Sequence, residues 1–469
     1  MLNYIWLGLV LLAVLIGGWT DRLKDVTDGA FDGAKTAVTI ALGLIGIMAL
    51  WLGVMRLAER AGLVQKIARG LRPIMRRLFP EVPPEHPAMG SMVMNMAANM
   101  LGLGNAATPL GLRAMRDLET LNRTPGVATN AMCMFLAINT SSVQLIPTTA
   151  IAILVTAGST RATEIIGTAF LATICSTVVG VSAAKFFEKV RAFRGEEGPA
   201  VTRATMAEAE RDNAPAPSNS PAAFKAATRP EVAESMMEEP LAVEVPPPAQ
   251  APGWATALLG LLGVFFFVIF LRMAFPPLFG LPFSPDAATQ NAFVRSVNAM
   301  SLLAIPFLLS FFPAYAAARG IKVYEEFVEG AKEGFTVILK IIPFLVTMLV
   351  AIGMFRGAGG IDLLTRALTP VMTPIQFPPD LLPMVLMRPL SGGATLALYT
   401  ELVQRLGADN IVTLMAATIF GSTETTFYVV AVYFGSVGVT RTRHAIPAGL
   451  LADLAGVIAA VIICRMMFA

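Results

Sequence analysis

Long apolar segments separated by short polar stretches run through almost the whole chain. Each approaches the roughly 20 apolar residues that a helix needs to cross a bilayer. In the first half they lie near 3–18, 36–55, 127–157 and 163–187. In the second half they lie near 254–275, 297–317, 335–354, 410–434 and 445–466. The pattern predicts an all-α polytopic membrane protein.

Two apolar stretches are too short or too polar to cross a bilayer as single helices. Residues 88–103 are rich in Gly and Asn, and residues 106–122 carry Arg113, Arg116 and Asp117. We expect this pair to form a re-entrant hairpin with one amphipathic arm. Residues 381–400 predict a second hairpin in the other half.

The same polar interruption occurs in both halves. Residues 106–108 follow the Gly- and Asn-rich run 102–105, and residues 394–395 follow Ser-Gly-Gly at 391–393. Each is followed by a long apolar segment that hydroxyl residues break, at 138–142 and at 421–425. Because an unpaired polar group in lipid costs several kcal/mol, matched breaks indicate two halves that line one polar cavity, as in many secondary transporters.

Short matches in the same order support an internal duplication. Gly33-Ala34-Lys35 resembles Gly330-Ala331-Lys332, and the stretch 69–75 resembles 366–372. Phe79-Pro80 then matches Phe377-Pro378. Between the halves, residues 191–252 are charged and Ala/Pro-rich without apolar periodicity, which is typical of a flexible linker. We therefore divide the chain into a repeat at 1–190, a linker at 191–252 and a second repeat at 253–469.

The distribution of basic residues predicts that the two repeats have inverted topology. The loop expected after the second span holds seven of them: Arg56, Arg60, Lys66, Arg69, Arg72, Arg76 and Arg77. Its counterpart holds only Arg356 and Arg366. By the positive-inside rule the first loop is cytoplasmic and the second is not. The segment 254–275 has no partner in the first half, and one extra crossing gives this inversion. The N-terminus, the linker and the loop with Arg441 are then cytoplasmic.

Composition agrees with the membrane assignment and excludes other classes. Hydrophobic residues make up 55% and charged residues 14% of 469 positions, and the mean hydropathy is +0.67. The net charge of +3 does not favour a nucleic-acid partner. His86 and His444 stand far apart, so no metal-ligand spacing is present, and no cofactor motif occurs. Residues 3–18 lack a basic start and a cleavage site, which favours a retained helix over a signal peptide.

Several motifs resemble two known families. Residues 1–190 are similar to spore maturation protein A, and residues 254–469 to spore maturation protein B. The motifs are Asn95-Met96-Ala97-Ala98-Asn99-Met100-Leu101-Gly102-Leu103-Gly104-Asn105-Ala106-Ala107-Thr108-Pro109, Ala137-Ile138-Asn139-Thr140, Arg388-Pro389-Leu390-Ser391-Gly392-Gly393-Ala394 and Gly421-Ser422-Thr423-Glu424-Thr425-Thr426-Phe427-Tyr428.

This resemblance implies a nucleoside recognition, or gate, domain. Similar domains occur in concentrative nucleoside transporters and in ferrous iron transport protein B, which implies a transport-like role in the bacterial plasma (inner) membrane. The chain has no G-x-x-x-x-G-K-[ST] motif, so it lacks a built-in GTPase of the iron-transporter type.

The polar residues in and beside the breaks are the candidate substrate-binding residues. They are Asn95, Asn99, Asn105, Thr108, Asn139, Thr140, Ser141, Arg388, Ser391, Thr395, Ser422, Thr423, Glu424 and Thr425. Each has a structural alternative. The Asn amides could join helices, and the hydroxyls could satisfy the backbone at a helix break. Arg388 and Glu424 could contact an anion and a coupling ion, or could pair with each other. Asp453 is either another polar contact or an interfacial residue.

We expect a transporter-like protein that moves a small polar solute, nucleoside-like or other, by alternating access. Expected partners are the lipid bilayer and a small solute or ion, and a homo-oligomer stays open. The alternative is a non-transporting envelope scaffold or regulator of spore or cell-wall maturation, and a third possibility is a passive channel. No catalytic constellation favours an enzyme.

Overall fold

The computed structural model describes residues 2–102, 104–190, 193, 252–283, 288, 290–363, 366 and 377–468. The predicted linker at 191–252 lies outside the described residues apart from Phe193 and Pro252. The side chain of Asn105 and most of the second-half stretch 366–372 also lie outside them.

Helices make up nearly all of the described structure, and the one β-bridge pairs Val127 with Arg441. The helices of the first half are α1 (Leu2–Trp19), α2 (Leu23–Arg60), α3 (Leu63–Leu78), α4 (Pro87–Met100), α5 (Gly104–Glu119), α6 (Asn130–Thr140), α7 (Thr148–Thr156) and α8 (Ile165–Lys189). Those of the second half are α11 (Gly253–Ala274), α13 (Ala292–Ala318), α14 (Val323–Gly357), α16 (Leu382–Met387), α17 (Gly392–Leu406), α18 (Ile411–Ser422), α19 (Thr426–Gly435) and α20 (Ala445–Phe468).

Six described helices are long and apolar enough to cross a membrane, which confirms the polytopic all-α class. They are α2, α8, α11, α13, α14 and α20. The predicted breaks are also present: the apolar run 127–157 contains α6 and α7, and the run 410–434 contains α18 and α19. The predicted hairpins are α4 with α5 and α16 with α17.

The halves repeat one order of elements. Helix α2 corresponds to α14, the hairpins and broken helices correspond in sequence, and α8 corresponds to α20. Equivalent helices also make equivalent contacts with the opposite repeat. Helix α1 contacts α14 while α13 contacts α2, and α8 contacts α18 while α20 contacts α6. Helix α11 has no counterpart in the first half among the described helices, as the sequence predicted.

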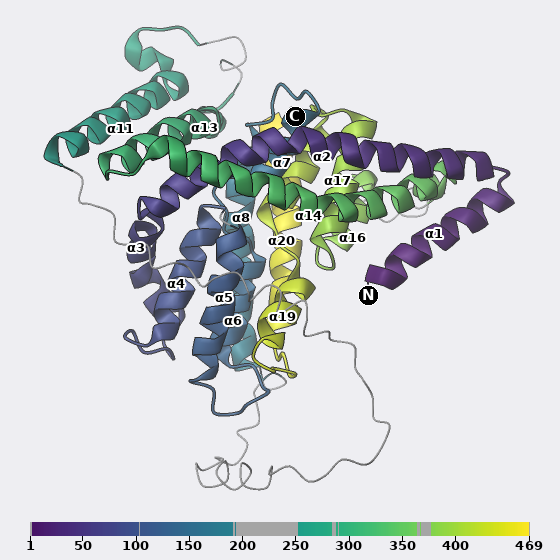
Figure 1. Ribbon diagram of the computed structural model, residues 1–469, viewed down its shortest axis with the longest axis horizontal. Helices are drawn as coiled ribbons and strands as arrows, with labels where there is room; N and C mark the ends of the chain where they lie inside the picture. The colour runs from purple at the N-terminus through teal and green to yellow at the C-terminus, as the bar shows by residue number, and fades with distance from the viewer. Residues whose placement is uncertain are drawn as a thin grey trace, which may run out of the picture.

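Helices α2 and α14 lie side by side and run antiparallel across the upper ends of the upright helices (Figure 1). Gly29 faces Gly353 and Gly33 faces Leu349 so closely that a Cβ on either glycine would overlap the partner's carbonyl group. At the other end Gly330 packs against Leu52 in the same way. Antiparallel packing of corresponding helices is what a two-fold relation between inverted repeats requires.

Both long helices extend beyond the predicted spans 36–55 and 335–354. The polar residues Asp25, Asp28 and Asp32 hid the start of α2, but their side chains are exposed while the glycines of the same segment contact α14. The predicted loop at 56–77 is also wrong. Arg56 belongs to α2, and most of the remainder forms α3, an amphipathic helix that buries Val64, Ala68 and Met75.

Arg56 joins the long helices at the α2 C-terminus. Its Nε lies 2.9 Å from Glu326 Oε2, and its Nη1 lies 2.6 Å from Glu333 Oε1. The α2–α14 pair therefore has glycine contacts along its length and an additional ionic contact where α2 ends.

Hydrogen bonds between the flanking loops join the two broken helices at both of their ends. At one end, Asp409 accepts hydrogen bonds from the hydroxyls of Ser159, at 2.5 Å, and Thr160, at 2.8 Å. At the other end, Ala128 N donates to Arg441 O at 3.0 Å, and Arg443 Nη1 donates to Ala128 O at 3.0 Å. Because α6–α7 and α18–α19 run in opposite directions, these contacts lie at opposite ends of the bundle.

Candidate polar site at the paired helix breaks

The two helix breaks are joined through their main chains. Helix α6 ends at Thr140 and α18 ends at Ser422. The amide of Glu424 donates to the carbonyl oxygen of Thr140 at 2.9 Å. Gly449 of α20 lies against both Thr426 and Thr140, so the last helix contacts both breaks.

Arg388 is buried at the C-terminal end of α18. It is 3% exposed, and its Nε donates to Thr423 Oγ1 at 3.0 Å. Its Nη2 donates to Phe420 O at 2.9 Å and also to Thr423 O. The guanidinium lies 4.7 Å from the centre of the Phe420 ring. Arg388 thus satisfies carbonyl groups that the end of α18 leaves unpaired, and its charge complements the negative end of the helix dipole.

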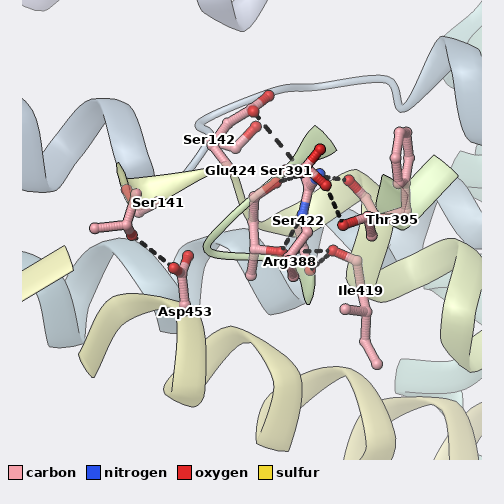
Figure 2. A network of polar contacts seen from close by, with 12 residues as sticks. Ser141, Ser142, Arg388, Ser391, Thr395, Ile419, Ser422, Glu424 and Asp453 are labelled. Carbon is pink, nitrogen blue, oxygen red and sulfur yellow. Dashed lines mark hydrogen bonds and ion pairs between the residues drawn. The ribbon is translucent and has the colours of Figure 1, made fainter. Parts of the chain in front are cut away.

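Glu424 is the accessible charge of the site. Its carboxylate lies 4.0 Å from the Arg388 guanidinium, and its side chain is 45% exposed. Figure 2 shows Arg388 beside the turn that carries Ser422 and Glu424, with Asp453 on the adjacent helix. The predicted alternative of a mutual Arg388–Glu424 pair is therefore present, although the hydrogen bonds of Arg388 go to α18.

Asp453 was not among the predicted substrate-binding residues. It is 4% exposed in α20, so its side chain lies in the protein interior. Its Oδ2 accepts a hydrogen bond from Thr426 Oγ1 at 2.6 Å, at the first turn of α19. Its Oδ1 is buried and has no hydrogen-bond partner among the described residues. The signal available in the sequence was a single acidic residue within an otherwise apolar segment.

The first repeat closes its break with neutral groups. Thr173 of α8 donates to the carbonyl oxygens of Ser141, at 2.7 Å, and Ser142, at 2.6 Å. Ser142 has φ of 46°, in the left-handed region that residues with a Cβ rarely adopt. Thr173 thus acts on the first break from α8, while Asp453 acts on the second break from α20.

Three predicted asparagines form a chain of amides beside the first break. Asn99 Nδ2 donates to Asn139 Oδ1 at 2.9 Å and lies 3.5 Å from Asn95 Oδ1. Asn95 Nδ2 donates to Ala107 O at 2.7 Å, which holds the two arms of the hairpin together. Asn99 joins the hairpin to α6, so the helix-joining alternative applies to these amides. The described helix α5 includes Thr108, which is half-buried.

The predicted hydroxyls mostly bond to the backbone of their own segments. Thr140 donates to Leu136 O, Ser141 to Ile138 O, and Thr423 to Ile419 O. In the second hairpin, Thr395 donates to Ser391 O, while the Ser391 hydroxyl caps α17 by accepting from Ala394 N. Ser422 lies 3.5 Å from Ile419 O, and Thr425 is buried directly before α19. The structural alternative therefore accounts for the positions of most hydroxyls.

The residues fall into two adjoining clusters. Arg388, Thr423 and Glu424 form the charged one, and Asn95, Asn99 and Asn139 form the neutral one. The Glu424–Thr140 hydrogen bond connects them, since Asn139 directly precedes Thr140. Among the described residues no group of three or more His, Cys, Asp or Glu side chains could hold a metal ion.

Comparison with known proteins places this architecture in a family. The model of the Gate family, described as nucleoside recognition, matches residues 41–157 and 338–440, one segment in each repeat. The chain is 42% identical over 195 residues to spore maturation protein A of Bacillus subtilis (strain 168), which covers 42% of this chain and 100% of that protein. It is 42% identical over 172 residues to spore maturation protein B of the same organism, which covers 37% of this chain and 97% of that protein. The chain belongs to the spore maturation protein A and B family and combines both parts in one polypeptide.

Proposed function

We propose that the protein is a transporter-like membrane protein that moves a small polar solute by alternating access, without covalent chemistry. The observation that carries this proposal is the meeting of two broken helices, one from each antiparallel repeat, at the Glu424–Thr140 hydrogen bond. The unpaired backbone groups of a broken helix are tolerated within a membrane where they line a polar cavity.

The chemistry around the breaks suits a polar solute. Glu424 offers a half-exposed carboxylate, and the Asn99–Asn139 pair offers amide donors and acceptors nearby. Amides and a carboxylate together can bind hydroxyl and amino groups of a neutral or cationic solute, such as a nucleoside-like molecule. The Gate family's description as nucleoside recognition makes nucleosides the first class to test.

We further propose that the protein lies in the bacterial plasma membrane with its N-terminus and linker cytoplasmic. The basic residues Lys185 and Lys189 at the end of α8 and Arg441 and Arg443 beside α20 support this orientation. The partners are then the bilayer and the solute.

Uptake into proteoliposomes tests the proposal. The purified protein is reconstituted and assayed against nucleosides, amino acids, short peptides and inorganic ions, with and without ion gradients. We expect saturable uptake of one class, which Glu424→Gln reduces at least several-fold. The matched control is Glu329→Gln, because Glu329 is an exposed glutamate of α14 that pairs with Lys332. Equal uptake by vesicles with and without the protein, for every solute of the panel, would count against transport.

The second candidate function is a non-transporting role in envelope assembly, which the names of the two relatives favour. A scaffold of this kind requires folding and partner binding but no solute passage. It predicts that Glu424→Gln supports spore or cell-wall maturation as well as the wild-type chain does, in a host that lacks its own proteins A and B. Loss of complementation together with loss of uptake favours the transporter.

A further inference from the structure

When Asp453 is counted with the charged cluster at the second break, the group contains one more carboxylate than it contains cations. Glu424 and Asp453 are the carboxylates, and Arg388 is the cation that interacts electrostatically with both. The other elements that contact α20 near Asp453 contribute hydroxyls. Thr426 of α19 bonds to Asp453 itself, Thr140 of α6 lies against Gly449, and Ser176 of α8 donates to Ala452 O. With both carboxylates ionised, the cluster carries a net charge of minus one.

A second cluster, around the buried Glu401, contains equal numbers of carboxylates and cations. Glu401, whose side chain is 6% exposed, lies 3.1 Å from Arg405 Nε and 3.9 Å from Arg356 Nη1. Arg405 also lies 2.7 Å from Asp380. Two arginines thus accompany two carboxylates. Glu401 therefore has two cationic neighbours, whereas Glu424 and Asp453 share Arg388.

The difference in burial between the two carboxyl groups indicates which of them is protonated. Glu424 is 45% exposed and can remain hydrated, whereas Asp453 is 4% exposed with an unpartnered Oδ1 among the described residues. An isolated charge at such a position neutralises by taking up a proton. A metal cation fits less well, because it requires several oxygen ligands, and Thr426 is the one hydrogen-bond partner of the Asp453 carboxyl group among the described residues.

We propose that Asp453 is a proton-binding site whose occupancy is set by Glu424 through their shared counter-charge, Arg388. While Glu424 is ionised, its carboxylate compensates the positive charge of Arg388, and Asp453 carries the proton. When Glu424 is neutralised, for instance by a cationic group of a ligand, Arg388 stabilises Asp453 as an anion and the proton leaves. This inference concerns one carboxyl group and stands whether or not the chain moves a solute.

Dicyclohexylcarbodiimide tests the proposal, because it modifies buried carboxyl groups in their protonated form. The full chain in detergent is treated across a pH series, and the modified peptides are identified by mass spectrometry. We expect modification at Asp453 near neutral pH and less at Glu401, which two arginines accompany. Infrared spectra of the same samples show a protonated-carboxyl band that Asp453→Asn removes.

Two further variants should shift the protonation of Asp453 in opposite directions. Glu424→Gln frees Arg388 for Asp453, so modification falls several-fold and its pH midpoint moves down. Arg388→Gln removes the counter-charge, so modification persists to higher pH. Glu424→Gln keeps every hydrogen bond of Arg388, which makes it the variant that preserves the fold. Absence of both the adduct and the infrared band, or an Asp453 response unchanged in Glu424→Gln, overturns the proposal.

Discussion

Gly29 of α2 and Gly353 of α14 meet backbone to backbone, and neither position has room for a Cβ. The contact lies midway in a series that runs from Asp25 against Gly357 to Gly33 against Leu349. Small residues allow helices in a membrane to approach closely, where dispersion and weak backbone contacts hold them. At each contact of this series, a glycine allows the backbones of the two repeats to touch.

Replacing Gly29 with alanine should destabilise this contact. The added Cβ meets the carbonyl of Gly353, so the helices must separate. We expect a loss of about 1–3 kcal/mol in the free energy of unfolding, as for other overpacked sites. The measurement is thermal or denaturant unfolding in detergent.

The control lies in the same helix. Gly46 has open space around its Cα, so Gly46→Ala should raise stability by about 0.5–1 kcal/mol through helix propensity alone. Equal effects of the two substitutions would show that α2 and α14 are not packed through Gly29.

Arg388→Gln should destabilise the second break. The substitution leaves the carbonyl oxygens of Phe420 and Thr423 without the hydrogen bonds from Arg388. Each buried acceptor that loses its partner lowers the free energy of unfolding by about 1–3 kcal/mol. Arg388→Lys should lose less, because an ammonium group can reach one acceptor but not both. Unfolding in detergent measures both variants. Arg441→Gln is the control, since the Arg441 side chain is exposed, and a loss as large as that of Arg388→Gln would contradict the capping role.

The Asp409 contact should make stability depend on pH in the acid range. Hydrogen bonds from Ser159 and then Thr160 hold the pKa of Asp409 below its ordinary value. A depressed pKa contributes stability that is complete above the unfolded-state pKa of about 4 and is lost as pH falls through the folded-state pKa. Asp409→Asn should therefore flatten the stability profile below about pH 4 and leave its slope near neutrality unchanged. An unchanged acid slope would contradict this account.

Cysteine labelling tests the orientation of the loops. Arg123 lies in the exposed loop between α5 and α6, and Ala157 lies in the exposed loop after α7. In a chain with Cys175→Ser, which removes the exposed native thiol, we expect Arg123→Cys to react from the cytoplasmic side and Ala157→Cys from the outside. Reaction of both from one side would contradict a membrane crossing by α6 and α7.

The sequence predicted the breaks and hairpins because polar residues in apolar segments are rare enough to be conspicuous. The stretch 138–142 and Arg388 lie at helix ends, and the amphipathic arm at 106–122 became α5. The match of Gly33 with Gly330 correctly paired α2 with α14. It did not show that these glycines make the contact between the helices, because a glycine has no side chain whose pattern reveals its partner.

Other features depended on contacts that only the folded chain shows. The polar start of α2 and the basic helix α3 were hidden because their charged residues face away from the core. Asp453 was underestimated because its burial depends on α19 reaching it through Thr426. The Asp409 contact joins residues 250 positions apart and left no signal in local composition.

The hydrogen bond between the breaks uses only main-chain atoms, the amide of Glu424 and the carbonyl of Thr140. Substitution of either side chain leaves both atoms in place. The surrounding side chains can therefore diverge, with charge in one repeat and neutral amides in the other, while the junction persists. A change in the side chains around the breaks therefore does not by itself remove the hydrogen bond that connects the two repeats.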